Sequence, residues 1–326
     1  MSRSWLVWAA AFAPWIISAA EAAAPAWKPD RPVEIVINTA PGSGADKAGR
    51  VIQKILQERR LIEVPVSVTN RPGGGGAIAY NYLNQHAGDA HVIAIASKSL
   101  LSNNIAGRGP GHTEFTQLAL MSGEYIGAAV RTESSLKSGL DLVERLKKDV
   151  GAASLGVATS LGGTNHQAVA GALHKAGIDM RKVRAVVFQS GGNAITAMLG
   201  GHVDVVLASL GSWVAHLKNK TVRILAVAAP QRQPGLFADV PTWRELGWDN
   251  VVSNWRSVIA PRGLTEPQMA YWEQVLRRVS QTDDWKAELE SSYASNDFMG
   301  PADTRKYMDA DYAEMKAFLT QLQLAK

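Results

Sequence analysis

The chain has 326 residues, of which 46% are hydrophobic and 19% charged, and its formal net charge at pH 7 is +5. This composition is typical of a folded protein with room for two domains, and it excludes an intrinsically disordered chain. The lack of cysteine excludes disulfides, thiolate zinc sites and thiol catalysis, and the scattered Lys and Arg residues predict no nucleic-acid partner.

The first 22 residues have the pattern of an export signal. Arg3 precedes an apolar stretch at 5–20 that contains Pro14, and a small-x-small cleavage pattern ends at Ala22. The stretch is short for a membrane span. We therefore expect residues 1–22 to be a signal peptide that is cleaved, leaving a mature protein in the periplasm.

Beyond residue 32, short apolar runs rich in β-branched residues alternate with stretches of helical periodicity. The apolar runs predict strands at 33–37, 64–69, 91–96, 125–130, 155–158, 183–188, 203–208 and 224–228. The periodic stretches predict helices at 45–56, from 77, at 140–148, at 165–175, ending at 199, at 213–218, from 265, at 282–291 and at 302–324. This alternation predicts an α/β fold with parallel sheets covered by helices on both faces.

Glycine-rich turns follow the first two predicted strands. One turn carries Gly42 and Gly44 and the other has four consecutive glycines at 73–76. Each turn leads into a predicted helix, whose unpaired N–H groups and dipole favour an anion. Loops rich in Gly, Ser, Thr and Asn also follow later strands, and parallel sheets bind ligands at the carboxyl ends of their strands. The sequence therefore predicts a site for a small acidic ligand.

Catalytic and metal motifs are incomplete. Ser160, Ser190 and Ser209 each have a glycine two residues later, but none has the leading glycine of the G-x-S-x-G nucleophile elbow. The first glycine-rich turn lacks the third glycine of a dinucleotide motif, and the histidines have no metal-ligand spacing. We expect neither a cofactor nor a metal, and a secreted α/β serine hydrolase that uses one of the three serines remains an alternative.

Several motifs occur in order along the chain, at 40–46 with Arg50, 68–76, 199–204, 222–227 and 239–242 with Glu245 and Gly247. Together they resemble the Bug-type (TctC-like) extracytoplasmic solute receptors of tripartite tricarboxylate transporters. Residues 254–256 and 162–166 further resemble the tricarboxylate-binding branch, which is associated with citrate-like ligands. In the first loop, Pro-Gly-Ser-Gly-Ala-Asp stands where Pro-Gly-Gly-x-x-Asp is usual in the family.

The resemblance implies a two-lobed periplasmic binding protein of type II, with two parallel-rich sheets flanked by helices and a ligand cleft between the lobes. Residues 28–129 plus 250–326 would form lobe 1, and residues 130–249 would form lobe 2. The protein would be a monomer, not an enzyme, and would deliver a small tricarboxylate or dicarboxylate to the membrane subunits of a transporter. A receptor that signals to a sensor kinase remains an alternative.

The resemblance and the glycine-rich loops together predict a ligand site shared by both lobes. The lobe 1 residues are Ser43, Gly44, Ala45, Asp46 and Ser97. The lobe 2 residues are Ser160, Gly163, Thr164, Asn165, Gly191, Gly192 and Asn193. Lys98 and Arg256 are candidates for direct charge pairing with the ligand.

Overall fold

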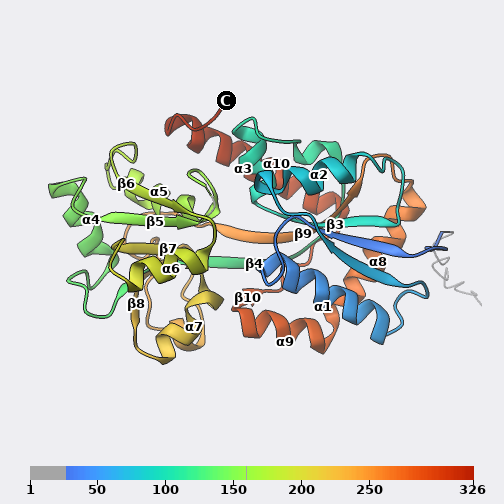
Figure 1. Ribbon diagram of the computed structural model, residues 1–326, viewed down its shortest axis with the longest axis horizontal. Helices are drawn as coiled ribbons and strands as arrows, with labels where there is room; N and C mark the ends of the chain where they lie inside the picture. The colour runs from blue at the N-terminus through green and yellow to red at the C-terminus, as the bar shows by residue number, and fades with distance from the viewer. Residues whose placement is uncertain (1–26, 159) are drawn as a thin grey trace, which may run out of the picture.

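The computed structural model describes residues 27–158 and 160–326. The expected signal peptide lies outside these residues. Figure 1 shows two lobes side by side along the longest axis, one holding β1 to β3 and the other holding β5 to β8. None of the helices in the described part of the chain is both long and apolar enough to span a bilayer.

The first lobe is built on a sheet with the strand order β2-β1-β3-β9-β4, in which β1 spans Val33–Ile37. The strands β2 (Val66–Asn70) and β3 (Val92–Ser97) lie parallel to β1 on either side, and β9 (Ser253–Pro261) runs antiparallel to β3. Side chains of β1 alternate between the two faces: Ile35 and Ile37 join one core and Val36 joins the other. Both faces of this sheet are therefore buried under helices.

Helices from distant parts of the sequence cover these two faces. One face packs against α1 (Gly44–Glu58), α8 (Glu266–Gln281) and α9 (Asp283–Ser292). The other face packs against α2 (Ala77–Asn84), α3 (Ser99–Ile105) and α10 (Pro301–Gln321). Short 3₁₀ turns at Gly74–Gly76 and His112–Glu114 complete this lobe.

The second lobe repeats the parallel arrangement around β5 (Ser154–Ala158). The strands β6 (Arg184–Phe188) and β7 (Val205–Ser209) flank it, and β8 (Val222–Val227) runs antiparallel to β4. The helices of this lobe are α4 (Gly139–Lys148) and α5 (Thr164–Lys175) on one core, and α6 (Gly191–Leu199) and α7 (Leu210–Lys218) on the other. A 3₁₀ turn at Gly235–Phe237 packs with the second core.

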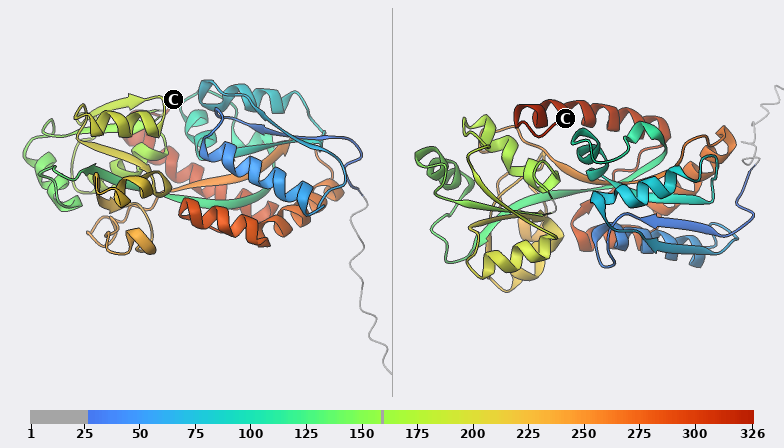
Figure 2. Two further views of the ribbon diagram at one scale, coloured as in Figure 1. Left: turned by 60° about the horizontal axis from the view of Figure 1, so that its bottom comes forward. Right: turned by 45° about the horizontal axis from the view of Figure 1, so that its top comes forward.

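The long strand β4 (Phe115–Arg131) joins the lobes. It pairs with β9 as far as Tyr125 and with β7 and β8 from Ile126 onward, always antiparallel. The short strand β10 (Ala294–Ser295) pairs with β4 near this change of partners. Helix α10 also lies across the junction (Figure 2), with Leu319 in the core of the first lobe and Leu322, the C-cap residue that follows the helix, in the core of the second.

The predicted α/β architecture with helices on both sheet faces is confirmed. The expectation of parallel sheets is incomplete, because β4, β8 and β9 run antiparallel to their neighbours. The sequence analysis did not predict β9, and it placed only residues 125–130 of β4 in a strand. The division into 28–129 plus 250–326 and 130–249 remains a prediction.

Candidate functional site

The first turn of α1 contains four of the predicted residues. Ser43 is the N-cap, and its Oγ accepts a hydrogen bond from the Asp46 N–H at 3.2 Å. The carboxylate of Asp46 accepts hydrogen bonds from the Gly42 N–H at 2.8 Å, from Arg50 Nε at 3.0 Å and from Asn70 Nδ2 at 2.9 Å. Asp46 is only 3% exposed, so its carboxylate holds the loop in shape and is committed to the protein.

The charge of Asp46 is stabilised in place. Burial alone would raise the pKa of Asp46, but hydrogen bonds from Arg50, the Gly42 N–H and Asn70 outweigh it and hold the pKa below its usual value. The carboxylate therefore stays ionised at neutral pH and keeps the glycine-rich turn fixed. Gly42 has φ of 81°, which suits glycine in this turn.

A buried polar cluster adjoins this turn at the ends of β1 and β3. Ser97 is 9% exposed, and its hydroxyl is 2.9 Å from that of Ser99. Asn38 Nδ2 donates to the Tyr80 hydroxyl at 2.9 Å, while Asn38 Oδ1 has no hydrogen-bond partner among the described residues. A Cβ on Gly76 would lie 2.8 Å from Asn38 Nδ2, which accounts for one glycine of the tetraglycine run.

The sequence analysis missed Asn38 and Tyr80. Asn38 directly follows a predicted strand, and a polar residue at that position could have indicated a place in the site. Tyr80 gave no signal, because an aromatic residue on a helix is usually part of a core. Burial raises the pKa of Tyr80, so its hydroxyl remains protonated at neutral pH.

The N-terminus of α5 contains a second group of predicted residues. Gly163 is the N-cap, and Thr164 and Asn165 begin the helix. The next residue, His166, is buried, and its Nδ1 accepts a hydrogen bond from the Gly162 N–H at 3.0 Å. Burial lowers the pKa of His166 to about 4, so the ring is neutral at pH 7 with its proton on Nε2.

The N-terminus of α6 contains the third group. Ser190 is the N-cap, and its Oγ accepts a hydrogen bond from the Asn193 N–H at 3.2 Å. Gly192 is exposed in the first turn. Within the described chain, seven backbone N–H groups in these three first turns have no protein acceptor: those of Gly44, Ala45, Thr164, Asn165, His166, Gly191 and Gly192.

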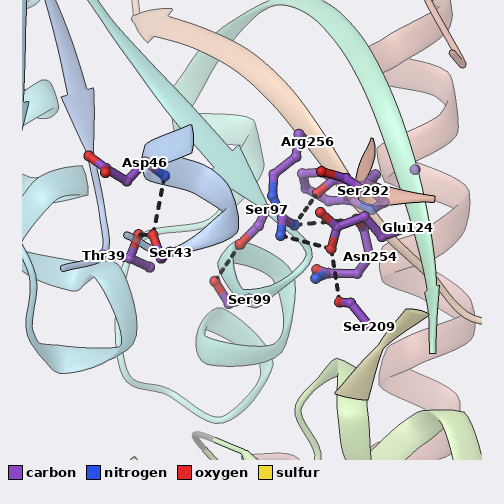
Figure 3. Close-up of polar contacts among 12 residues, drawn as sticks. Thr39, Ser43, Asp46, Ser97, Ser99, Glu124, Ser209, Asn254, Arg256 and Ser292 are labelled. Atoms are coloured by element: carbon purple, nitrogen blue, oxygen red, sulfur yellow. Dashed lines mark hydrogen bonds and ion pairs between the residues drawn. The ribbon is translucent and has the colours of Figure 1, made fainter. Parts of the chain in front are cut away.

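A charged pair lies between the two lobes (Figure 3). Arg256 Nη2 donates to Glu124 Oε2 at 3.2 Å, and the Ser209 hydroxyl donates to the same oxygen at 2.9 Å. A Cβ on Gly44 would lie 2.9 Å from Arg256 Nη2 and 3.4 Å from Glu124 Oε1. The first turn of α1 therefore abuts this pair, while Ser209 reaches it from the end of β7.

The predicted residues thus form one group in the first lobe and two helix starts in the second. Among the described residues, no hydrogen bond joins a predicted ligand residue of the first lobe to one of the second. Glu124 connects the lobes only indirectly, because it lies beside Gly44 and accepts a hydrogen bond from Ser209. Lys98 and Arg256, the candidates for charge pairing with the ligand, each have a carboxylate partner in the protein: Lys98 Nζ lies 2.6 Å from Asp311 Oδ1, and Arg256 pairs with Glu124. Whether the predicted residues surround one ligand remains a prediction.

The three serines considered as nucleophiles have other surroundings. Ser209 donates to Glu124, and Ser190 donates to Asn193. In the part of the chain that the structure describes, no histidine hydrogen-bonds to Ser160, Ser190 or Ser209. Residues 27–158 and 160–326 also contain no group of three or more potential metal ligands.

A cavity of about 890 Å³ lies at a different place between the lobes. It is lined by α5, α10 and the chain around 249–255. The predicted residues at the three helix starts do not line it, but Lys98, a candidate for charge pairing with the ligand, does. Its polar lining includes Asp297, Asp311 and Glu314, and burial together with these carboxylates raises the pKa of Tyr307. The lining also contains Lys98, Lys175 and Arg244, so its charge is mixed and does not by itself distinguish anionic from cationic ligands.

The comparison with protein families decides which family the chain belongs to. Residues 49–324 match the model of the tripartite tricarboxylate transporter family receptors, TctC. The chain belongs to this family. The resemblance to Bug-type receptors is thereby confirmed, and the protein is a solute-binding receptor of the tripartite tricarboxylate transporter type.

Individual relatives agree with this assignment. BugT of Bordetella pertussis is 27% identical over 248 residues, which cover 74% of this chain and 73% of BugT. The structure of R. palustris Rpa4515 with adipate has a TM-score of 0.80 at 22% identity, covering 91% of this chain and 99% of Rpa4515. MatC (Rpa3494) from Rhodopseudomonas palustris with bound malate has a TM-score of 0.77 at 21% identity, covering 89% and 99%. These structures confirm the two-lobed periplasmic binding protein fold for the receptor.

Proposed function

We propose that this receptor captures a small di- or tricarboxylate in the periplasm and delivers it to the membrane subunits of a tripartite tricarboxylate transporter. The observation that carries the proposal is the set of backbone N–H groups at the starts of α1, α5 and α6 that have no acceptor among the described residues. Such groups, together with the helix dipole, bind carboxylates without a charged side chain. The complexes of structural neighbours with adipate and malate support a carboxylate ligand.

In this mechanism each lobe holds one end of the ligand. The N–H groups of Gly44 and Ala45, with Ser43 and Ser97, take one carboxylate in the first lobe. Asp46 takes no direct part, since its carboxylate is occupied in bracing the turn.

The second lobe takes the other end of the ligand at two helix starts. The residues proposed to do so are Ser160, Gly163, Thr164, Asn165, Gly191, Gly192 and Asn193. A ligand held from both sides stabilises a closed arrangement of the lobes, which the transporter would recognise. We propose residues 28–129 plus 250–326 and 130–249 as the moving bodies of a monomer, with β4 and β9 as the connection.

Capture without chemistry agrees with the surroundings of the candidate nucleophiles. The Ser209 hydroxyl donates to Glu124, whose carboxylate is held in an ion pair with Arg256, and among the described residues no histidine hydrogen-bonds to Ser209 as in a Ser-His-Asp triad. Receptor families of this kind bind and release their solute unchanged. We accordingly propose a receptor that is not an enzyme, exported after removal of residues 1–22.

The experiment is a thermal-shift series on protein that has been unfolded and refolded to remove bound ligand. The panel runs from monocarboxylates through succinate, malate and adipate to tricarballylate and citrate, with succinamide as an uncharged control. A ligand at about 100 times its Kd stabilises the fold by about 2.7 kcal/mol, a shift of a few degrees. Stabilisation by particular carboxylates and not by succinamide is expected. No shift with any acid, together with ester hydrolysis or labelling by a serine-reactive phosphonate, would instead favour the hydrolase.

A further inference from the structure

Glu124 and Arg256 form a nearly enclosed ion pair between the two groups of proposed ligand residues. Their side chains are 14% and 9% exposed, respectively. Arg256 lies opposite Ser97 in the register of β9 and β3, and its guanidinium touches the first turn of α1 at Gly44. Ser209, at the end of β7 in the other lobe, donates to the Glu124 carboxylate. A change of charge at this pair therefore acts on a ligand held by either lobe.

The pairing leaves no unbalanced buried charge. Within the described residues, the buried Asp, Glu, Lys and Arg side chains are Asp46, Lys98 and Arg256. Asp46 pairs with Arg50, Lys98 with Asp311 and Arg256 with Glu124. The positive potential offered to a ligand then comes mainly from the helix starts, each equivalent to about half an elementary charge.

Three such helix starts match a dianion better than a trianion. A dicarboxylate carries two negative charges, and the N-termini of α1, α5 and α6 together are equivalent to about one and a half positive charges. A third carboxylate would enter a partly desolvated region in which the buried cations among the described residues, Lys98 and Arg256, are already paired, which is unfavourable. Lys47 lines the same pocket as Arg256, but its side chain is exposed, so solvent screens its charge. Without Glu124, the guanidinium of Arg256 would supply a cation to balance the third carboxylate.

We propose that Glu124 is a specificity-determining residue that neutralises Arg256 and so makes the receptor select dicarboxylates over tricarboxylates. This inference rests on the proposed carboxylate-binding function. The guanidinium would act on a third carboxylate through its charge, since its Nη2 donates to Glu124, its Nη1 donates to the carbonyls of Asn254 and Trp255, and its Nε is buried. The Glu124 carboxylate is what cancels the attraction of this group for an extra negative charge.

The test compares matched ligands that differ by one carboxylate. Glutarate and tricarballylate share a five-carbon chain, and adipate and butane-1,2,4-tricarboxylate share a six-carbon chain. Isothermal titration at pH 8 on ligand-stripped protein gives the Kd ratio of each pair for the wild type and for each variant. The wild type is expected to favour the dicarboxylate of a pair.

Two variants should shift this ratio in opposite directions. Glu124→Gln keeps an oxygen that accepts from Arg256 and Ser209 but removes the charge, and it should shift the ratio towards the tricarboxylate by about tenfold. Arg256→Gln should shift it by a similar factor towards the dicarboxylate. A unit charge about 10 Å away, at an effective dielectric constant of about 20, changes an equilibrium constant by roughly this amount. Because the two variants are expected to shift the Kd ratio in opposite directions, either one alone still tests the proposal if the other does not fold.

Glu133→Gln is the matched control, since it removes one carboxylate charge from an exposed side chain of the second lobe. Its ratio should equal that of the wild type. A folded Glu124→Gln or Arg256→Gln variant with an unchanged ratio would overturn the inference and leave the proposed function intact. Failure of the wild type to bind any carboxylate would overturn the proposed function itself, and the inference with it.

Discussion

Replacing Gly192 with valine should remove ligand binding while leaving the fold intact. Gly192 lies in the exposed first turn of α6, where its φ is outside the left-handed region. A Cβ at this position would meet no atom nearer than Ser190 Oγ at 3.8 Å, so the folded chain has room for the larger side chain. Valine also has a slightly better helix propensity than glycine. We expect the free energy of unfolding to change by less than about 1 kcal/mol.

The effect on binding should be far larger. The valine side chain would cover the N–H groups of Gly191 and Gly192, which have no protein acceptor among the described residues. A hydrogen bond to a charged group contributes about 1.5–3 kcal/mol, so losing two should weaken binding by at least about 100-fold.

Titration calorimetry with the most stabilising carboxylate measures the affinity of Gly192→Val, and urea unfolding measures its stability. Gly151→Val, in an exposed turn of the same lobe, is the matched control and should bind as the wild type does. A folded Gly192→Val protein that keeps its affinity within threefold would show that the start of α6 does not hold the ligand.

Two further predictions concern the residues that support the site. Asp46→Asn should lower the free energy of unfolding, measured in urea, by about 2–4 kcal/mol. The reason is that the substitution removes a buried carboxylate that pairs with Arg50 and accepts a hydrogen bond from the Gly42 N–H. A decrease below about 1 kcal/mol would contradict this bracing role. The pKa of His166 is about 4 in the fold and about 6.5 unfolded, so its contribution is present above pH 6.5 and is lost as the pH falls towards 4. Between these pH values the wild type should lose about 3 kcal/mol more stability than His166→Gln. A variant of exposed His174 on the same helix, His174→Gln, should follow the wild type, and equal pH profiles for all three proteins would refute the reasoning.

Local sequence signals were sufficient for the starts of α1 and α5, but they did not predict α3 at Ser99–Ile105. The sequence placed the beginnings of α1 and α5 at residues 45 and 165, and the structure begins them at Gly44 and Thr164. Capping depends on a few neighbouring residues, such as Ser43 and Asp46, whose chemistry is visible in the sequence. The loops that lead into these helices could therefore be proposed as anion sites before the fold was known.

The strands that join the lobes were not predictable in the same way. The apolar pattern of β4 is interrupted by Gly123 and Glu124, which are polar or small where the strand changes partners. The charged Glu124 can be enclosed at this position only because a residue far away in the sequence pairs with it. The partner of Glu124 is Arg256, which is 132 residues away in the chain, and no local periodicity reports such a pairing. For the same reason the bond between Asn38 and Tyr80 was missed.

The most direct test of the proposed receptor mechanism is a crystal structure of the stripped protein with the carboxylate that stabilises it most. We expect one ligand carboxylate on the N–H groups of Gly44 and Ala45, and another at the starts of α5 and α6 in the opposite lobe. A ligand bound in the cavity between α5 and α10, with the three helix starts empty, would contradict it.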